Sequence, residues 1–302
     1  MNDTKQKITP FLWFDKNCEE AVNFYTSVFQ NSKIISLQKY PDNVEEEHMK
    51  GMEGKILTAI FELDGYRFMG LDGGPIFKFN PSISFHVKCK TKEEVDVLWE
   101  KLSEGGEVLM PLDSYPFSDR YGWCNDKFGV SWQIILTPDF KDQKFTPVLM
   151  FTQEAAGKAE EAANYYASVF KNSKVNVLMR YDKGEEPETE GNIKYAQLVL
   201  EGQEFGIMES KQDHKFKFNE AISLYVEVDG QEELDYFWEK LTTKPEFEQC
   251  GWLKDKYGVS WQIIPKQMGE LMGKDKSGKV IAAMLQMKKI VIKDLEAAYE
   301  SS

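Results

Sequence analysis

The chain contains one segment twice, and this duplication constrains its fold more than any other feature. The run FYTSVF at residues 24–29 recurs as YYASVF at 165–170, and in both places Asn-Ser-Lys follows after one further residue. Two other blocks recur unchanged: FKFN at 77–80 and 216–219, and GVSWQII at 129–135 and 258–264. Three blocks repeated in the same order indicate two copies of one module, from about Thr9 to Ile135 and from Thr146 to Ile264.

The length of 302 residues agrees with two modules, because a domain usually contains about 150 residues. We expect a first module at residues 1–140, a second at 141–266 and a C-terminal helical tail at 267–302. The copies differ in length, since 52 residues separate Phe77 from Gly129 but only 42 separate Phe216 from Gly258. The second copy is therefore predicted to lack most of the segment that corresponds to Met110–Asp119, interpreted as a loop that could cover a pocket.

Within each copy the hydrophobic period alternates between that of a helix and that of a strand. Apolar residues recur at helical spacing around residues 18–29 and 95–102, and again around 159–170 and 234–241. Short runs rich in β-branched and aromatic residues lie at 56–63, 83–87 and 130–136. Each copy is thus predicted to be α+β, with the order β-α-β-β-β twice over.

Charge and cysteine content exclude several classes of partner and site. Lys and Arg total 37 against 50 Asp and Glu, a net charge of −13, which repels nucleic acid and anionic membranes. No apolar run approaches the roughly 18 residues of a membrane span, and the start MNDTKQKITP lacks the apolar core of a signal peptide. The four cysteines form no CxxC pair and do not match between copies. We expect a cytoplasmic protein without a nucleic-acid or membrane partner.

The strand at 83–87 alternates cleanly and predicts which side chains face a cavity. Ile83, Phe85 and Val87 should face the helices, whereas Ser84 and His86 should face the other way. The same parity places Pro10, Leu12 and Phe14 of the first strand, and Ser131, Gln133 and Ile135 of the last strand, on that second face. A curved sheet with helices outside would turn this face into a cavity.

Three segments of the first copy together resemble a known family. They are TPFLWF at 9–14, EEAVNFY at 19–25 and DKFGVSWQ at 126–133. Their order resembles the PhnB-like branch of the vicinal oxygen chelate superfamily, which includes glyoxalase I, bleomycin- and fosfomycin-resistance proteins and extradiol dioxygenases. This branch often carries the label 3-demethylubiquinone-9 3-methyltransferase. The resemblance covers nearly the whole chain, twice.

The resemblance implies an architecture of paired βαβββ units, each pair wrapping a curved mixed sheet around a pocket. Two copies in one chain would form a covalent pseudo-dimer, which could also pair as a homodimer. The tail at 280–299 is similar to the family's C-terminal helix. Val280, Met284 and Met287 are expected on one side of that helix, packed on a module or across the pair.

The resemblance also implies where a metal would bind. Metal-dependent members place His or Gln on the first strand, His or Glu on the fifth and Glu on the eighth. The matching positions carry Pro10 or Leu12, Ser84 or His86, and Gln133 in the first copy, and Pro147 or Leu149, Ser223 or Tyr225, and Gln262 in the second. Only His86 and Gln133 could ligate, and neither is negatively charged, so no metal is predicted. The ligand-pocket candidates are Leu12, Phe14, Ser84, His86, Ser131, Gln133, Leu149, Ser223, Tyr225 and Gln262.

Several of these residues allow two interpretations. His86 could act as a general base near neutral pH or hydrogen-bond within a polar patch. Gln133 and Gln262 could hold a ligand or fix a neighbouring strand, and the Gly-Trp pairs at 122–123 and 251–252 could line a pocket or simply pack. Trp132 and Trp261 are interpreted as core anchors. Cys250 is interpreted as a structural thiol, and His48 and His214 as solvated loop residues.

The methyltransferase label does not agree with a usual S-adenosylmethionine site. Such a site has a glycine-rich turn between a strand and a helix, but Gly70, Gly73 and Gly74 are followed by Pro75 and another strand-like run. We therefore expect no cofactor and a small-molecule binding protein without a metal. The alternatives are an enzyme that uses a metal or His86, the labelled methyltransferase activity, and a purely structural or partner-binding role.

Overall fold

The computed structural model describes residues 6–40, 51–275 and 277–301. The chain forms two compact units, one of Pro10–Ile222 and the other of Met1–Thr9 with Ser223–Ser302. Within the described residues, no helix is both long enough and apolar enough to span a membrane.

The first copy has the predicted order β-α-β-β-β twice over. Its elements are β1 (Ile8–Phe14), α1 (Cys18–Val28), β2 (Lys33–Lys39), β3 (Ile56–Leu63), β4 (Tyr66–Asp72), β5 (Ile83–Cys89), α2 (Lys92–Ser103), β6 (Glu107–Tyr115), β7 (Ser118–Asn125) and β8 (Ser131–Leu136). The prediction of an α+β module built from two βαβββ units is confirmed for this copy.

The second copy has one strand fewer. Its elements are β9 (Phe145–Phe151), η2 (Gln153–Ala155), α3 (Ala159–Val169), β10 (Lys174–Arg180), β11 (Ile193–Leu200), β12 (Gln203–Glu209), β13 (Ile222–Val228), α4 (Gln231–Leu241), η3 (Pro245–Phe247), β14 (Trp252–Lys254) and β15 (Ser260–Pro265). The segment that the second copy lacks was expected to be a loop, and this is wrong. Met110–Asp119 forms most of β6 and the turn into β7, so the second copy has lost a strand.

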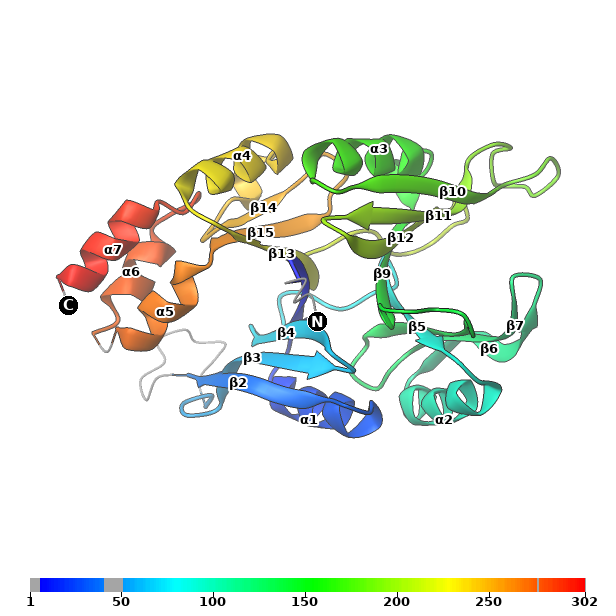
Figure 1. Ribbon diagram of the computed structural model, residues 1–302, viewed down its shortest axis with the longest axis horizontal. Helices are drawn as coiled ribbons and strands as arrows, with labels where there is room; N and C mark the ends of the chain where they lie inside the picture. Colours follow the sequence, from blue (N-terminus) through cyan, green and yellow to red (C-terminus); the bar gives the residue numbers. More distant parts are fainter. Residues whose placement is uncertain (1–5, 41–50, 276, 302) are drawn as a thin grey trace. The chain divides into compact units, whose positions relative to one another are not determined.

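An eight-stranded mixed sheet lies entirely within the larger unit, in the order β10-β11-β12-β9-β5-β8-β7-β6. Four of its strands come from the second half of the first copy and four from the first half of the second copy. Antiparallel pairing of β5 with β9 joins the two sets, with Ser84 opposite Val148 and His86 opposite Thr146. Figure 1 shows this sheet curving, with α3 and α2 on its outer side. The opposite, concave face therefore carries residues from both copies.

An aromatic core lies on the helix-facing side of β5, β8 and β9. The Trp132 ring centroid lies 5.4 Å from that of Phe85 and 5.4 Å from that of Tyr25 on α1. Phe145 on β9 packs against Phe29, with centroids 4.9 Å apart. All five side chains are buried. Burying an aromatic side chain contributes roughly 1.5–3 kcal/mol, so this cluster fixes which face of β5 and β8 is left for the concave side.

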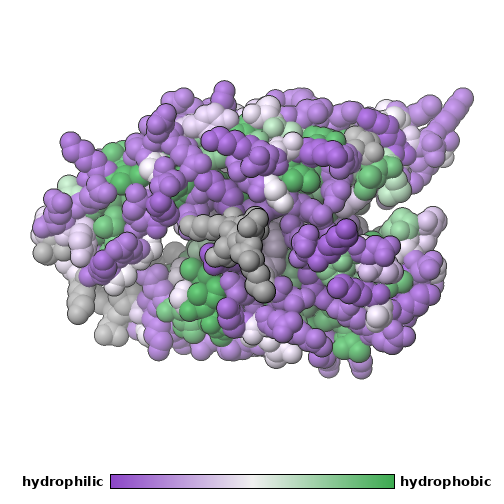
Figure 2. Space-filling view, viewed as in Figure 1, coloured by the Kyte–Doolittle hydropathy of each residue, from purple (hydrophilic) through white to green (hydrophobic). Residues whose placement is uncertain are grey.

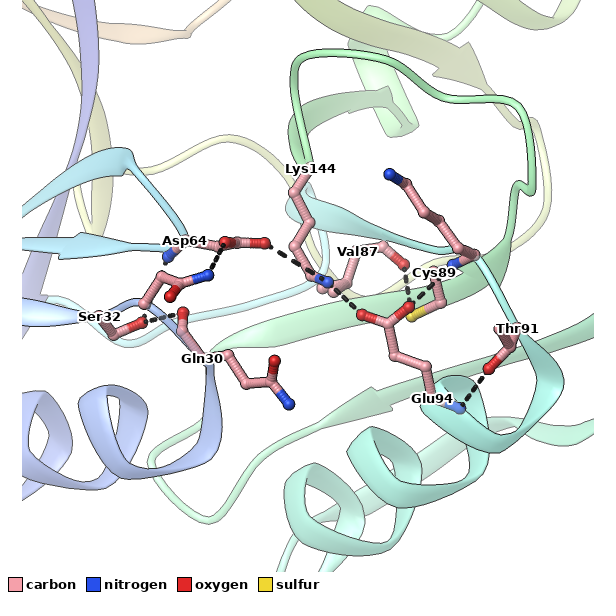
Figure 3. Close-up of polar contacts among 10 residues, drawn as sticks. Gln30, Ser32, Asp64, Val87, Cys89, Thr91, Glu94 and Lys144 are labelled. Carbon is pink, nitrogen blue, oxygen red and sulfur yellow. Dashed lines mark hydrogen bonds and ion pairs between the residues drawn. The ribbon is translucent and has the colours of Figure 1, made fainter.

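The segment that joins the two copies is held by Lys144 (Figure 3). Its ammonium group forms an ion pair with Glu94 at the start of α2, and lies 3.7 Å from Oδ2 of Asp64 in the turn between β3 and β4. Thr91 caps α2, because its side chain accepts a hydrogen bond from the Glu94 amide. The Lys144 side chain is only 11% exposed. Two acidic groups thus fix the start of the second copy against the first.

The tail in the smaller unit contains three helices, α5 (Gln267–Lys274), α6 (Lys279–Leu285) and α7 (Ile292–Glu300). The expectation that Met287 shares a helix with Val280 and Met284 is wrong, because α6 ends at Leu285. The carbonyl of Met287 instead accepts a hydrogen bond from the Cys250 amide at 2.8 Å. The short segment after α6 therefore supplies backbone acceptors to the second copy rather than an apolar helical stripe.

Candidate functional site

The centre of the concave face is a pair of polar side chains on neighbouring strands. His86 on β5 and Gln133 on β8 are partners in parallel register, and Nε2 of His86 lies 2.9 Å from Oε1 of Gln133. Both side chains are buried. The position of Gln133 follows from that of its neighbour. Trp132 is fully buried in the core, and because side chains alternate along a strand, Gln133 lies on the opposite face.

Two further hydrogen bonds fix the orientation of the Gln133 amide. The Tyr121 hydroxyl on β7 donates to Oε1 at 2.6 Å, and Nε2 donates to Oγ of Ser84 at 2.7 Å. An amide oxygen can only accept, so Nε2 of His86 must carry the proton in this arrangement. Nδ1 of His86 then keeps its lone pair. The centre consequently offers an acceptor, Nδ1, on the side of His86 away from Gln133.

Two residues of the second copy complete the surroundings of His86. The Tyr195 ring on β11 stacks on the imidazole at 5.4 Å, and its hydroxyl lies 3.4 Å from Nδ1. Thr146 on β9 lies directly opposite His86 and is only 2% exposed. Its hydroxyl has no hydrogen-bond partner among the described residues. Because buried polar groups are nearly always hydrogen-bonded, this hydroxyl is available to a partner that the described residues do not supply.

Burial lowers the pKa of His86 from 6.5 to about 4, and the positive charge of Lys88 acts in the same direction, whereas the bond to Gln133 opposes them. The imidazole is therefore neutral near pH 7. It can accept a hydrogen bond, but a base with so low a pKa removes protons weakly at neutral pH. Burial also raises the pKa of Tyr121 and Tyr195 well above 10, so both phenols stay protonated.

An apolar cluster lies beside this polar centre. Tyr121, Trp123 and Met150 are its buried members, and the half-buried side chains packed against them are Leu109, Met110, Tyr115, Ile135, Met208 and Phe216. Nε1 of Trp123 donates to Oγ of Ser131 at 2.8 Å, which places Ser131 on the same face. Figure 2 shows the surface hollowed between the β10–β11 edge and the β6–β7 hairpin. Half-buried aromatic and methionine side chains around a few polar groups are typical of a small-molecule site.

The structure places the first-strand candidates on the opposite face from the one expected. Leu12 pairs with Gly70, and a side chain at Gly70 would meet Cys18 of α1 and the Phe14 ring. Leu12 and Phe14 therefore face α1. Leu149 likewise pairs with buried Ile207, whereas Val148 pairs with Gly206 on the side of Tyr195. Nearly every residue of β1 and all of β9 are buried, so no alternation in these strands could reveal the parity.

The second copy keeps part of the polar centre, in the smaller unit. Nε2 of Gln262 donates to Oγ of Ser223 at 2.9 Å, the same bond that joins Gln133 to Ser84. Tyr225 pairs in register with Gln262, where the first copy has His86. Burial raises the pKa of Tyr225 well above 10. The amide is thus kept in both copies, while the imidazole beside it is replaced by a phenol.

The repeated Asp-Lys-(Phe or Tyr)-Gly-Val-Ser-Trp turn has a structural role. Oδ2 of Asp126 accepts from Nε1 of Trp132 at 2.8 Å and from the Tyr25 hydroxyl at 2.7 Å, and Oδ1 accepts from the amides of Phe128 and Val130. Oδ2 of Asp255 accepts from Trp261 in the same way. The interpretation of both tryptophans as core anchors agrees with these contacts and with their full burial.

The remaining histidines lie away from this centre. His214 is in the loop after β12, with Nε2 3.0 Å from Oγ of Ser210. His48 lies outside the described residues. Tyr121, Tyr195 and Thr146 were not identified from the sequence. Tyr121 could have been found, because it lies two residues before Trp123 on the same strand and so faces the same side of the sheet. Tyr195 and Thr146 belong to the other copy, and no sequence pattern near them indicates that they lie beside His86.

The donors on the concave face do not fit a divalent metal ion. His86 and Gln133 bond to each other, and Leu12, at the first-strand ligand position, has no donor atom and faces α1. Across the described parts of the chain, no three His, Cys, Asp or Glu side chains gather in a way that could hold a metal. A neutral imidazole and one amide offer no charge to offset such an ion.

The 3-demethylubiquinone-9 3-methyltransferase family model matches residues 6–135 and 143–264. The chain belongs to this family. Its two matches coincide with the two copies, so the tandem repeat and pseudo-dimer are confirmed, as is the resemblance to the PhnB-like branch.

The chain is also similar to three individual proteins. A putative 3-demethylubiquinone-9 3-methyltransferase, PhnB protein, of Bacillus cereus is 48% identical over 44% of this chain and 100% of its own, with a TM-score of 0.41. An uncharacterized protein of Mycobacterium tuberculosis is 26% identical over 42% of this chain and 72% of its own. Glyoxalase I of Zea mays is 10% identical, with a TM-score of 0.50 over 79% of this chain and 82% of its own, which shows a shared fold.

The name of the family implies a methyl donor, which the chain's turns do not fit. The strand-to-helix connections in the described structure are residues 15–17, 90–91, 152–158, 229–230 and 266. None of these contains a G-x-G-x-x-G motif or a similar glycine-rich run. These connections therefore do not fit the usual S-adenosylmethionine site, which is a glycine-rich turn between a parallel strand and a helix.

Proposed function

We propose that this chain is a small-molecule binding protein and that its ligand binds on the concave face of the eight-stranded sheet without a metal. The observation that carries the proposal is the buried Thr146 hydroxyl, which has no partner among the described residues and lies opposite His86. Nδ1 of His86 is an acceptor and the hydroxyl is a donor. A ligand group that bonds to both would satisfy this centre.

The surroundings support a binding role. The cluster around Tyr121, Trp123 and Met150 is only partly covered, and partly exposed apolar clusters with a polar centre are typical of ligand sites. Methionine side chains adapt to the shape of a bound molecule. The second copy lacks both the histidine and the β6 strand, so we expect the site that contains His86 to be the active one.

The proposal is tested by screening aromatic and cationic metabolites for an increase in melting temperature. Compounds that bind the wild type should lose most of their effect in Gln133→Met, which breaks the polar centre, and keep it in the matched variant Gln262→Met of the second copy. Absence of any stabilising compound would contradict the proposal. Loss of binding in Gln262→Met but not in Gln133→Met would place the site elsewhere.

A second candidate is an enzyme in which His86 accepts a proton. The lone pair on Nδ1 supports it, whereas the pKa near 4 opposes it. Glyoxalase and dioxygenase assays, with elemental analysis and added divalent ions, test it directly. Any turnover should vanish in His86→Gln; turnover that survives would have another origin.

We also propose that the protein is cytoplasmic, supported by four unpaired cysteines. Pairing of two chains into a homodimer is checked by light scattering on the purified protein.

A further inference from the structure

The tip of the β6–β7 hairpin is an aromatic cluster that only the first copy has. The rings of Tyr115 and Phe117 stack at 5.6 Å, and the Tyr121 ring lies edge-on to both, at 5.5 and 4.9 Å. Phe117 is 46% exposed. A large ring held in this way at a loop tip loses hydrophobic stabilisation unless something covers it.

This aromatic cluster is joined directly to the polar centre. Tyr121 contributes its ring to the cluster and its hydroxyl to Oε1 of Gln133, which also bonds to His86. Tyr115 and Met110 pack on the same apolar cluster as Met150 and Met208, which come from strands of the second copy. Rings, methionine side chains and hydrogen-bonding groups therefore share one face of the sheet.

The groups around His86 are uncharged. The amide of Gln133, the hydroxyl of Thr146 and the protonated phenol of Tyr195 surround it. The charge of Lys88, two residues along β5, lowers the pKa of His86, but Lys88 forms an ion pair with Glu204, and this pair has no net charge. A charged ligand would lose its hydration here without gaining an opposite charge, which makes its burial costly.

We propose, on the basis of the function proposed above, that the ligand is an uncharged aromatic compound that carries a hydroxyl group. Its ring lies against Tyr115, Phe117 and the methionines. Its hydroxyl donates to Nδ1 of His86 and accepts from Thr146. The Tyr195 contact to Nδ1, at 3.4 Å, is at the long end for a hydrogen bond, so a ligand hydroxyl can replace it.

The test uses the full chain labelled with ¹³C at the methionine methyl groups, titrated with phenol, cyclohexanol or benzoate. Phenol should move the methyl signals of Met110, Met150 and Met208 upfield, because an aromatic ring shields groups above its face. Benzoate, the charged analogue, should bind at least about tenfold more weakly. Cyclohexanol should bind more weakly than phenol. Signals are assigned by single Met→Leu variants.

Each other outcome overturns the inference. Equal binding of benzoate contradicts an uncharged ligand, equal binding of cyclohexanol contradicts recognition of a ring, and shifts confined to other methionines place the phenol elsewhere. A failure to bind phenol also overturns it. The function proposed above survives that failure if a compound from the metabolite screen still depends on Gln133.

The hairpin is tested with Phe117→Ala, which removes an exposed ring and should leave the fold intact. Losing one aromatic contact should weaken phenol binding by roughly two- to tenfold. The matched control is Phe247→Ala, which removes an exposed ring from η3 in the smaller unit and should leave phenol binding unchanged. If Phe117→Ala binds phenol with wild-type affinity, the hairpin is not part of the binding site.

Discussion

Nε2 of His86 lies 2.9 Å from Oε1 of Gln133, and the two residues are register partners on β5 and β8 although 47 positions separate them in the chain. The bond fixes the imidazole as a neutral ring that donates through Nε2. Its other neighbours are Tyr195, Thr146 and Lys88, and Gln133 itself is shared with Tyr121. None of these is an anion that would stabilise the protonated ring.

The pKa of His86, lowered from 6.5 to about 4, predicts a pH-dependent stability. Between these values the unfolded chain binds more protons than the folded one, so the free energy of unfolding falls as pH falls from about 6.5 to about 4. One pKa unit corresponds to about 1.4 kcal/mol, so His86 should account for about 3 kcal/mol. The measurement is urea unfolding at about pH 7 and about pH 4, in wild type and His86→Gln.

His86→Gln is the control because glutamine keeps a donor for Gln133 and cannot titrate. The difference between the two proteins isolates His86 from the carboxyl groups that also titrate. An imidazole resonance that moves with a midpoint near 6.5 would show that the ring is solvated, which would contradict the burial of His86.

Gln133→Met should destabilise the protein more than Gln262→Met. The first change leaves the Tyr121 hydroxyl and the Nε2 proton of His86 without their acceptor and Ser84 without its donor. Each buried group left unpaired costs about 1–3 kcal/mol, so we expect about 3 kcal/mol for Gln133→Met and about 1 for Gln262→Met. Denaturant unfolding measures both, and equal losses would mean that the polar centre adds nothing.

The sequence identified the polar centre where a polar residue alternates with buried apolar ones. Ser84 and His86 stand between Ile83, Phe85 and Val87, and Gln133 follows Trp132, so their faces could be assigned correctly. The first strands gave no such alternation, since β9 is buried at every position. The assignment therefore failed at Leu12, Phe14 and Leu149. The pairing of β5 with β9 is a long-range property of the duplicated chain, so Thr146 and Tyr195 could not be placed beside His86 from local pattern.

Lys144→Met should cost about 2 kcal/mol or more. The change leaves Glu94 and Asp64 without their shared cation at a half-buried site, where an unpaired charge is expensive. The control is Lys215→Met, because Lys215 and its partner Asp213 are 81% and 87% exposed and such pairs contribute little. Thermal unfolding at low and high salt compares the two. A similar small effect for both would show that the junction does not depend on Lys144.

The two copies of the FKFN block are hydrogen-bonded to each other. Nδ2 of Asn80 donates to the carbonyl of Lys217 at 3.1 Å, and Nδ2 of Asn219 donates to the carbonyl of Lys78 at 2.8 Å. Each asparagine also accepts from a backbone amide two residues ahead. Replacing either by aspartate keeps this acceptor, removes the donor and turns a carboxylate toward a carbonyl.

We expect Asn80→Asp and Asn219→Asp each to lower the free energy of unfolding by about 1 kcal/mol. Because the two bonds join the same pair of segments, breaking one should loosen the other. The double variant should therefore lose at least about 0.5 kcal/mol less than the sum of the single losses, as for residues in contact. Urea unfolding of the four proteins gives this value, with exposed Asn23→Asp on α1 as the control. Strict additivity would mean that the two bonds act independently and that the reciprocal contact does not join the copies.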